Sequence, residues 1–122
     1  MLVISPAIFA SEKYISQFKN KITRISSFSS SINGIAGENQ ILTIELEKNG
    51  VVTGINTVKP INNKELIKSA IKIVQLASPY KPLHYDFSEE TESIKIELVF
   101  TLSEQQNILI SKASLISISN SK

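Results

Sequence analysis

The residues that could do chemistry are few, and they gather around one histidine. His84 is the single histidine of the chain, and Asp86, Glu89 and Glu90 follow it within a short segment. A metal ion held by histidine and carboxylates needs a recognised ligand spacing, which this segment lacks. We therefore interpret His84 as a solvent-facing or packing side chain, and we expect no metal and no cofactor.

The other patterns that an enzyme needs are also missing from the sequence. No serine lies in a G-x-S-x-G motif, and Gly34 and Gly37 lack the spacing of a phosphate-binding loop. The chain has no cysteine, which excludes disulfides, thiolate metal ligands and thiol nucleophiles. The sequence therefore predicts a protein that is not an enzyme. A catalytic or small-molecule role in a pocket near His84 and Tyr85 is the alternative to test.

The composition indicates one soluble globular domain. Of 122 residues, 42% are hydrophobic and 20% charged, which suits a single core. Basic and acidic side chains, 13 against 11, are interspersed, so nothing favours nucleic acid. Residues 1–10 are apolar but too few for a membrane span, which takes about 20 apolar residues. We interpret 1–10 as an apolar arm or as the remnant of a signal peptide cleaved after Ala10, and 11–122 as the domain.

Two segments with apolar residues at helical spacing predict two helices. The first should run over residues 11–27, with Ser11 as its N-cap. The second should run over residues 63–76. Asn62 precedes it and Glu65 follows three residues later, which is the spacing of a capping box. Each helix has a broad apolar face, so each needs a sheet to cover.

A hairpin is predicted between the helices. Residues 40–48 and 51–58 both have the pattern of strands, and the Asn49-Gly50 pair between them is typical of a two-residue type I′ turn. That turn would fix the register of the two strands. The expected pairs are Ile44 with Ile55 and Leu46 with Thr53.

Two more strands are predicted after the second helix. Residues 94–102 alternate most regularly, which indicates one buried and one open face. Residues 107–118 are rich in Ile, Leu and Ser and have a less regular pattern that could form a fourth strand. The sequence thus predicts an α+β fold of order αββαβ, in which two helices pack on an antiparallel sheet.

Four segments occur in an order that points to a known family. They are the hairpin at 42–58, the helical segment 65–71, the aromatic-x-Pro exit 80–82 and the strand 94–102. In this order they resemble the C-terminal domain of the TonB and TolA energy-transducing proteins, over about residues 14–102. The family's Tyr-Pro pair after the first helix, its N-terminal membrane anchor and its proline-rich spacer are missing. We therefore expect a fragment or a periplasmic relative.

The resemblance implies a location in the periplasm of the Gram-negative cell envelope and a three-stranded sheet of order 2-1-3, with the third strand at an edge. It also implies that a segment of an outer-membrane receptor adds as a strand beside that edge, for energy-coupled transport. An edge strand offers unpaired N–H and C=O groups, so strand addition demands little of the partner's sequence. We therefore expect the partner on residues 94–102. The candidate site residues are Lys95, Glu97, Val99 and Thr101.

Two other functions stay open, and so does the question whether residues 107–118 cover the edge strand 94–102. A TolA-like domain would bind another envelope protein in the same way. A self-assembling structural protein would pair 94–102 or 107–118 between copies, for example as a homodimer. If 107–118 lies along the third strand instead, the binding strand is masked. A partner must then displace it or use the other edge, at 51–58.

Overall fold

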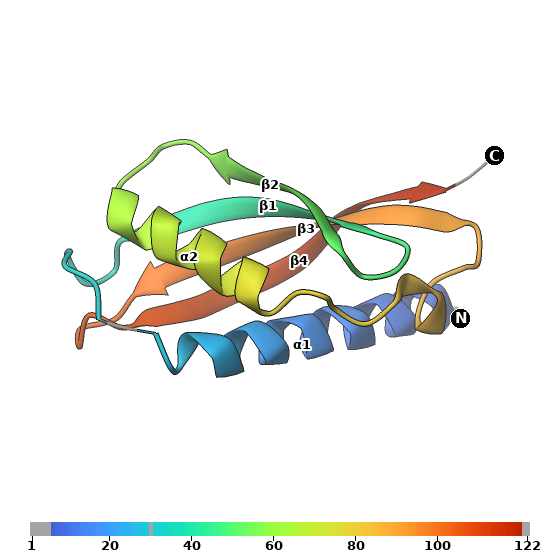
Figure 1. Cartoon of the computed structure of the whole chain (residues 1–122), viewed down its shortest axis with the longest axis horizontal. Coiled ribbons are helices and arrows are strands. Elements are labelled where there is room, and N and C mark those ends of the chain that lie inside the picture. Colours follow the sequence, from blue (N-terminus) through green and yellow to red (C-terminus); the bar gives the residue numbers. More distant parts are fainter. Residues whose placement is uncertain (1–5, 30, 121–122) are drawn as a thin grey trace, which may run out of the picture.

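One antiparallel sheet carries both helices on the same face (Figure 1). The computed structural model describes residues 6–29 and 31–120. The sheet has the order β2-β1-β3-β4, which confirms the α+β class and includes the fourth strand. The elements are α1 (Pro6–Ser26), β1 (Asn39–Glu47), β2 (Val52–Val58), α2 (Lys64–Leu76), the short 3₁₀ helix η1 (Leu83–Tyr85), β3 (Thr91–Leu102) and β4 (Ile108–Asn120).

Helix α1 begins earlier than its sequence pattern predicts. It spans Pro6–Ser26, and proline fits the first turn of a helix, where its missing N–H would have no partner. Ser11 therefore lies inside the helix, and its predicted role as N-cap is wrong. Residues 6–10 of the expected arm belong to α1, and 1–5 lie outside the described residues.

Helix α2 is capped by the second of two neighbouring asparagines. The side chain of Asn63 accepts a hydrogen bond of 3.1 Å from the backbone N–H of Leu66. The predicted cap, Asn62, instead donates its backbone N–H to the side chain of Gln40 and its amide to the backbone of Asn39. Gln40 is buried, so this contact anchors the chain between β2 and α2 to the sheet.

The β1–β2 hairpin has a three-residue loop, so the predicted two-residue turn is wrong. Gly50 N–H donates to Glu47 C=O at 2.8 Å, and Glu47 N–H donates to Val51 C=O at 3.0 Å. Gly50 has φ +84°, whereas Asn49 is not among the residues with positive φ. A type I turn followed by a left-handed glycine is the usual three-residue hairpin loop.

The loop changes part of the hairpin register. Ile44 pairs with Ile55 as predicted. Leu46 pairs with Val52 instead of Thr53, because a bulge shifts the register on one strand. The shift is confined to the end near the loop.

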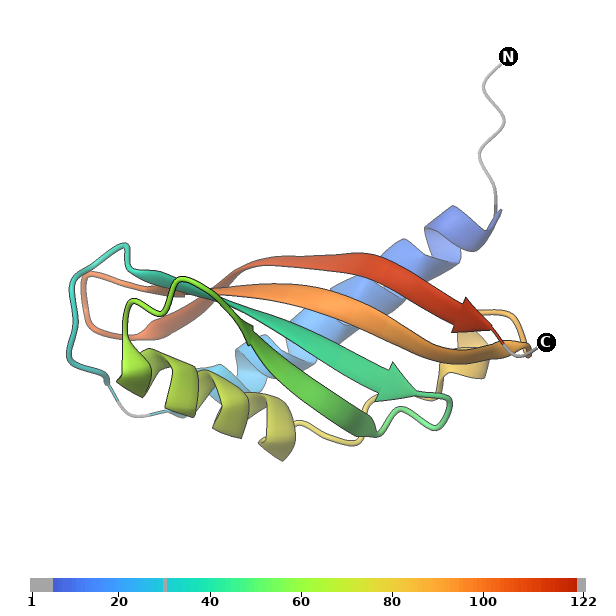
Figure 2. The ribbon, with the colours of Figure 1, turned by 90° about the horizontal axis from the view of Figure 1, so that it is seen from above.

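The core lies between the helices and one face of the sheet (Figure 2). Every second residue of β1, and of β3 from Ile94 onward, is buried, as the alternation predicted. Full burial of an aliphatic or aromatic side chain stabilises a fold by about 1.5–3 kcal/mol. The main contributors are Tyr14, Phe18 and Ile22 from α1, Leu66, Ala70, Ile73 and Val74 from α2, and Leu42, Ile44, Leu46, Ile94, Ile96, Leu98, Phe100, Leu102, Ile108 and Ile110 from the sheet.

Buried tyrosines fix the segment after α2 against α1. Tyr14 donates its hydroxyl to Lys81 C=O at 2.6 Å, and Tyr80 donates to Val74 C=O at 2.9 Å. The Lys81 ammonium lies 3.1 Å from the Asp86 carboxylate. Burial raises the pKa of both phenols, and the charge of Asp86 adds to the rise in the pKa of Tyr14. Both hydroxyls therefore remain protonated donors.

Candidate partner-binding site

The predicted binding strand lies inside the sheet. β3 pairs with β1 on one side and with β4 on the other, over nearly its whole length. A further strand can therefore pair with β3 only after β4 has left. In the described chain the edge position expected for this strand belongs to β4, which is the masked arrangement considered for residues 107–118.

The four candidate residues share the open face of the sheet. Lys95, Glu97, Val99 and Thr101 alternate with the buried residues of β3. Lys95 is exposed and the other three are half-buried. The Thr101 hydroxyl lies 2.9 Å from the Ser111 hydroxyl on β4. The structure thus brings these side chains onto one surface, while the backbone of β3 pairs with its two neighbours.

Two strands have an unpaired edge within residues 6–29 and 31–120, namely β2 and β4. β4 has 13 residues and β2 has seven. At about 3.3 Å per residue, these edges extend over roughly 43 Å and roughly 23 Å. β4 exposes three large aliphatic side chains, Leu109, Ile116 and Ile118, at 52%, 50% and 47%. The apolar side chains of β2 are half-buried, so β4 has the longer and more apolar edge.

The edge of β4 has few of the features that protect natural edge strands. Such strands are usually short or carry proline and several lysines, which discourage pairing with other chains. β4 is long, has no proline and has one lysine, Lys112. Its bulges leave Ser111 and Ile116 without a paired residue on β3. Bulges are one protective feature of edge strands and also change the direction of side chains; Ile116 is one of the exposed residues.

Helix α1 lies beside β4 on the helix-bearing face (Figure 2). Ile15 of α1 and Leu115 of β4 are partly buried against the edge of the core. A strand added at β4 would alternate its side chains between this face and the open one. Its inner side chains could therefore contact an existing apolar margin.

His84 lies in η1, and its ring is stacked beside that of Tyr85, with 4.2 Å between the ring centroids. Both side chains are exposed. No three His, Cys, Asp or Glu side chains gather as a metal site would require in the described residues. In that part of the chain, neither helix is long and apolar enough to cross a membrane.

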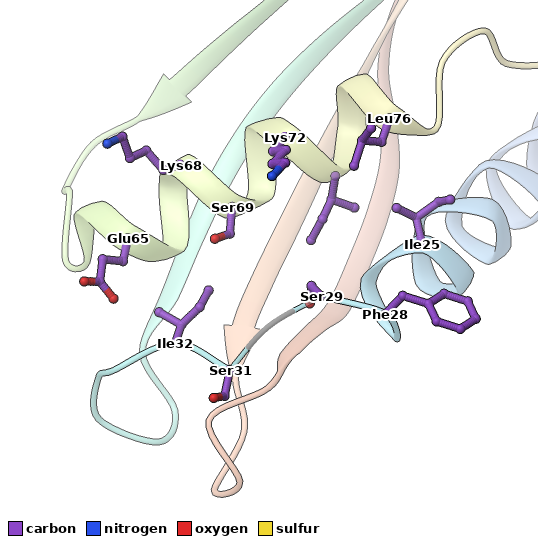
Figure 3. Close-up of a pocket in the computed structure, with 11 residues that line it drawn as sticks. Ile25, Phe28, Ser29, Ser31, Ile32, Glu65, Lys68, Ser69, Lys72 and Leu76 are labelled. Carbon is purple, nitrogen blue, oxygen red and sulfur yellow. The ribbon is translucent and has the colours of Figure 1, made fainter.

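Sequence reasoning missed a groove between α2 and the residues that follow α1 (Figure 3). Its volume is about 610 Å³. Phe28 and Leu76 line it and are 89% and 62% exposed. The available signals were a phenylalanine within a serine-rich stretch and a leucine at the exposed end of α2. Neither signal indicates a groove without the fold.

Comparison with known proteins assigns most of the chain to one family. The family model described as the Gram-negative bacterial TonB protein C-terminal matches residues 31–102, from the loop before β1 to the end of β3. No curated protein and no solved structure matches the chain. α1 and β4 lie outside the matched range.

Proposed function

Because the chain belongs to the family of the TonB protein C-terminal domain, we propose that it binds an extended segment of an envelope partner as an added strand of its sheet. The family consists of periplasmic protein-interaction domains and is not an enzyme family. In the proposed role, the partner is an outer-membrane receptor and binding couples it to energy-driven transport. A TolA-like role would use the same geometry with another envelope protein.

The observation that carries the proposal is the unpaired edge of β4. A partner strand would receive main-chain hydrogen bonds along this edge. Its side chains would meet the exposed Leu109 on the open face and Ile118 on the helix-bearing face, as their pairing with Thr101 and Ile94 indicates, and Ile116 at a bulge. Each of these is about half exposed, so covering one would contribute about 1 kcal/mol. Affinity would therefore come from the backbone and from a few aliphatic contacts, with modest demands on sequence.

Binding at the outer edge of β4 costs less than binding at β3. A partner that replaced β4 would have to remove Ile108 and Ile110 from the core, where they are 3% and 8% exposed. Each removal would cost about 1.5–3 kcal/mol. The later half of β4, residues 114–120, is mostly exposed and would leave at a smaller cost. Contact with Lys95 and Glu97 after such a partial displacement is the competing mode.

The test is a titration of isotope-labelled protein with peptides from the N-terminal segments of outer-membrane receptors, followed by NMR. We expect the main shifts along β4. The variants Leu109→Lys and Ile116→Lys should weaken binding, because each places a charge in the new contact. Ile61→Lys is the matched control, since Ile61 is 49% exposed outside the sheet. Shifts confined to Lys95, Glu97, Val99 and Thr101 would favour displacement of β4, and no shift with any peptide would exclude this class of partner.

Self-pairing is the second candidate, and the same unpaired edge favours it. Two copies related by a two-fold axis would pair β4 with β4 and extend the sheet across both. Sedimentation at high protein concentration tests this directly. A strictly monomeric profile would rule out self-assembly.

A further inference from the structure

A groove on the helix side of the molecule has no role in strand addition. It lies between α2 and the residues after α1 (Figure 3). The side chains of Ile25, Ile32 and Ile73 line its apolar part. Ile32 and Ile73 belong to the core, so the base of the groove is the outer surface of that core.

Two large apolar side chains at the groove are strongly exposed. Phe28 is 89% exposed and Leu76 is 62% exposed. Single exposed apolar residues are ordinary, but a concave surface with several of them is typical of a docking site. Covering Phe28 and Leu76 is therefore a source of binding energy that the isolated domain does not use.

The side of the groove formed by α2 is positively charged. Lys68 and Lys72 are four residues apart, so they lie on one side of the helix, about 5–6 Å from each other at Cβ. Both are exposed, and neither forms an ion pair in the part of the chain that the structure describes. Glu65, near the start of α2, is the acidic residue of the lining. The groove therefore favours an occupant with carboxylates along one side.

We propose that this groove docks an extended segment of a partner protein in which apolar and acidic residues alternate. From Glu65 to Leu76 the helix rises by about 16 Å, at about 1.5 Å per residue. An extended segment of about five residues has that length, at about 3.3 Å per residue. Residues two apart in such a segment are about 6.6 Å apart. Two carboxylates at that spacing match Lys68 and Lys72, and the apolar residues that alternate with them face Ile25 and Ile73.

The position of the groove favours a separate protein as its occupant. Both ends of the described chain, at Pro6 and Asn120, lie at the opposite end of the molecule (Figures 1 and 2). A flat membrane surface would meet Phe28 and Leu76 but would not fill the groove that they help to line. No residue of β4 lines the groove, so the proposal stands whether or not strand addition occurs.

The probe is a short capped peptide that alternates leucine and glutamate, titrated into isotope-labelled full chain. We expect NMR shifts centred on Phe28, Ser69 and Ile73. A counterpart with lysine in place of glutamate should bind about tenfold more weakly. The double variant Lys68→Glu/Lys72→Glu should reverse this preference. A tenfold change corresponds to about 1.4 kcal/mol, within the range of two surface charge pairs.

Matched variants separate groove binding from other effects. Lys13→Glu/Lys59→Glu changes the net charge equally at exposed sites outside the groove lining and should leave the preference intact. Ser69→Trp should fill the groove and abolish the shifts. Should Ser69→Trp unfold the chain, Phe28→Ser provides the same test, because Phe28 is 89% exposed and contributes little to folding.

Three outcomes would overturn the proposal. The glutamate-containing and lysine-containing peptides could bind with equal affinity, both to the unmodified protein and to Lys68→Glu/Lys72→Glu. The shifts could appear along β4 and disappear in Ile116→Lys, which would assign the peptide to the strand edge. The protein could bind phosphatidylglycerol vesicles through Phe28 and Leu76 while the peptide leaves the groove unchanged, which would assign the patch to a membrane surface.

Discussion

Replacement of Gly50 by alanine should destabilise the domain more than its small size suggests. Gly50 has φ +84° in the β1–β2 loop, a conformation that alanine adopts at a cost. A Cβ atom at this position would lie 2.1 Å from the Tyr80 carbonyl oxygen and 2.9 Å from that of Lys81. Tyr80 also donates its backbone N–H to Gly50 C=O at 2.8 Å. The hairpin loop and the segment after α2 are therefore fitted to one another at a position without a side chain.

The expected loss follows from two contributions. The left-handed conformation costs a residue other than glycine about 1–2 kcal/mol. The Tyr80 backbone must also move to make room for the methyl group, and this breaks its hydrogen bond to Gly50, which is worth about 1 kcal/mol. The free energy of unfolding of Gly50→Ala should therefore fall by about 2–3 kcal/mol. This is a large part of the roughly 5–15 kcal/mol that stabilises a typical domain.

Urea denaturation of Gly50→Ala and Gly54→Ala measures this directly. Gly54 is the matched control, because its φ is ordinary and the nearest atom to an added Cβ is Glu45 Cβ at 3.7 Å. Gly54→Ala should lie within about 0.5 kcal/mol of the unmodified protein or stabilise it slightly, because glycine is unfavourable inside a strand. The reasoning is refuted if Gly50→Ala loses less than about 0.5 kcal/mol, or if both variants lose equally.

Three further predictions concern polar side chains that bond to the backbone. Asn63→Ala should destabilise the domain by about 1–2 kcal/mol through loss of the α2 cap, and Asn62→Ala by less, so an equal loss in urea titrations would contradict the cap assignment. Gln40→Leu should cost about 1–3 kcal/mol, because the backbone N–H groups of Asn62 and Asn63 lose their acceptor; an unchanged urea midpoint would show that water replaces it. Folding raises the pKa values of Tyr14 and Tyr80. Below about pH 10 both phenols are protonated in the folded and in the unfolded chain, and their contribution to stability is complete. At higher pH only the unfolded chain loses these protons, so the contribution is lost. Stability measured from about pH 8 to about pH 11 should thus fall more steeply for the unmodified protein than for Tyr14→Phe, and parallel curves would contradict this.

The elements that could be predicted from sequence are those whose pattern is set by the core itself. β3 alternates because Ile94, Ile96, Leu98, Phe100 and Leu102 all face the helices. α2 was predicted for the same reason, since its buried residues recur at helical spacing. In both cases local periodicity and tertiary burial agree, so either one indicates the element.

The less regular elements could be identified only through their neighbours. β4 has a weak alternation because its bulges at Ser111 and Ile116 interrupt the period of two, and the sequence alone could not place it beside β3. Asn62 and Asn63 are equal cap candidates by residue type, and the contact of Asn62 with Gln40 separates them. The hairpin loop depends likewise on its contact with Tyr80.

The candidate sites illustrate the same limit. The likeness to TonB proteins indicated strand addition, but the position of the unpaired edge depends on where β4 lies. The groove is lined both by residues after α1, such as Phe28, and by residues of α2, such as Leu76, and these segments border one groove only through the packing of α1 and α2. Surface features built from distant segments have no periodic signal.

Hydrogen exchange along β4, with and without a bound receptor segment, tests strand addition most directly. In the described chain no strand covers the outer side of β4, so its outward amide groups should exchange rapidly in the unbound protein. Strand addition at this edge predicts that these amides become protected on binding, while the exchange of β3 stays unchanged. Unchanged exchange along β4 with the segment bound, or faster exchange as β4 leaves the sheet, would contradict it.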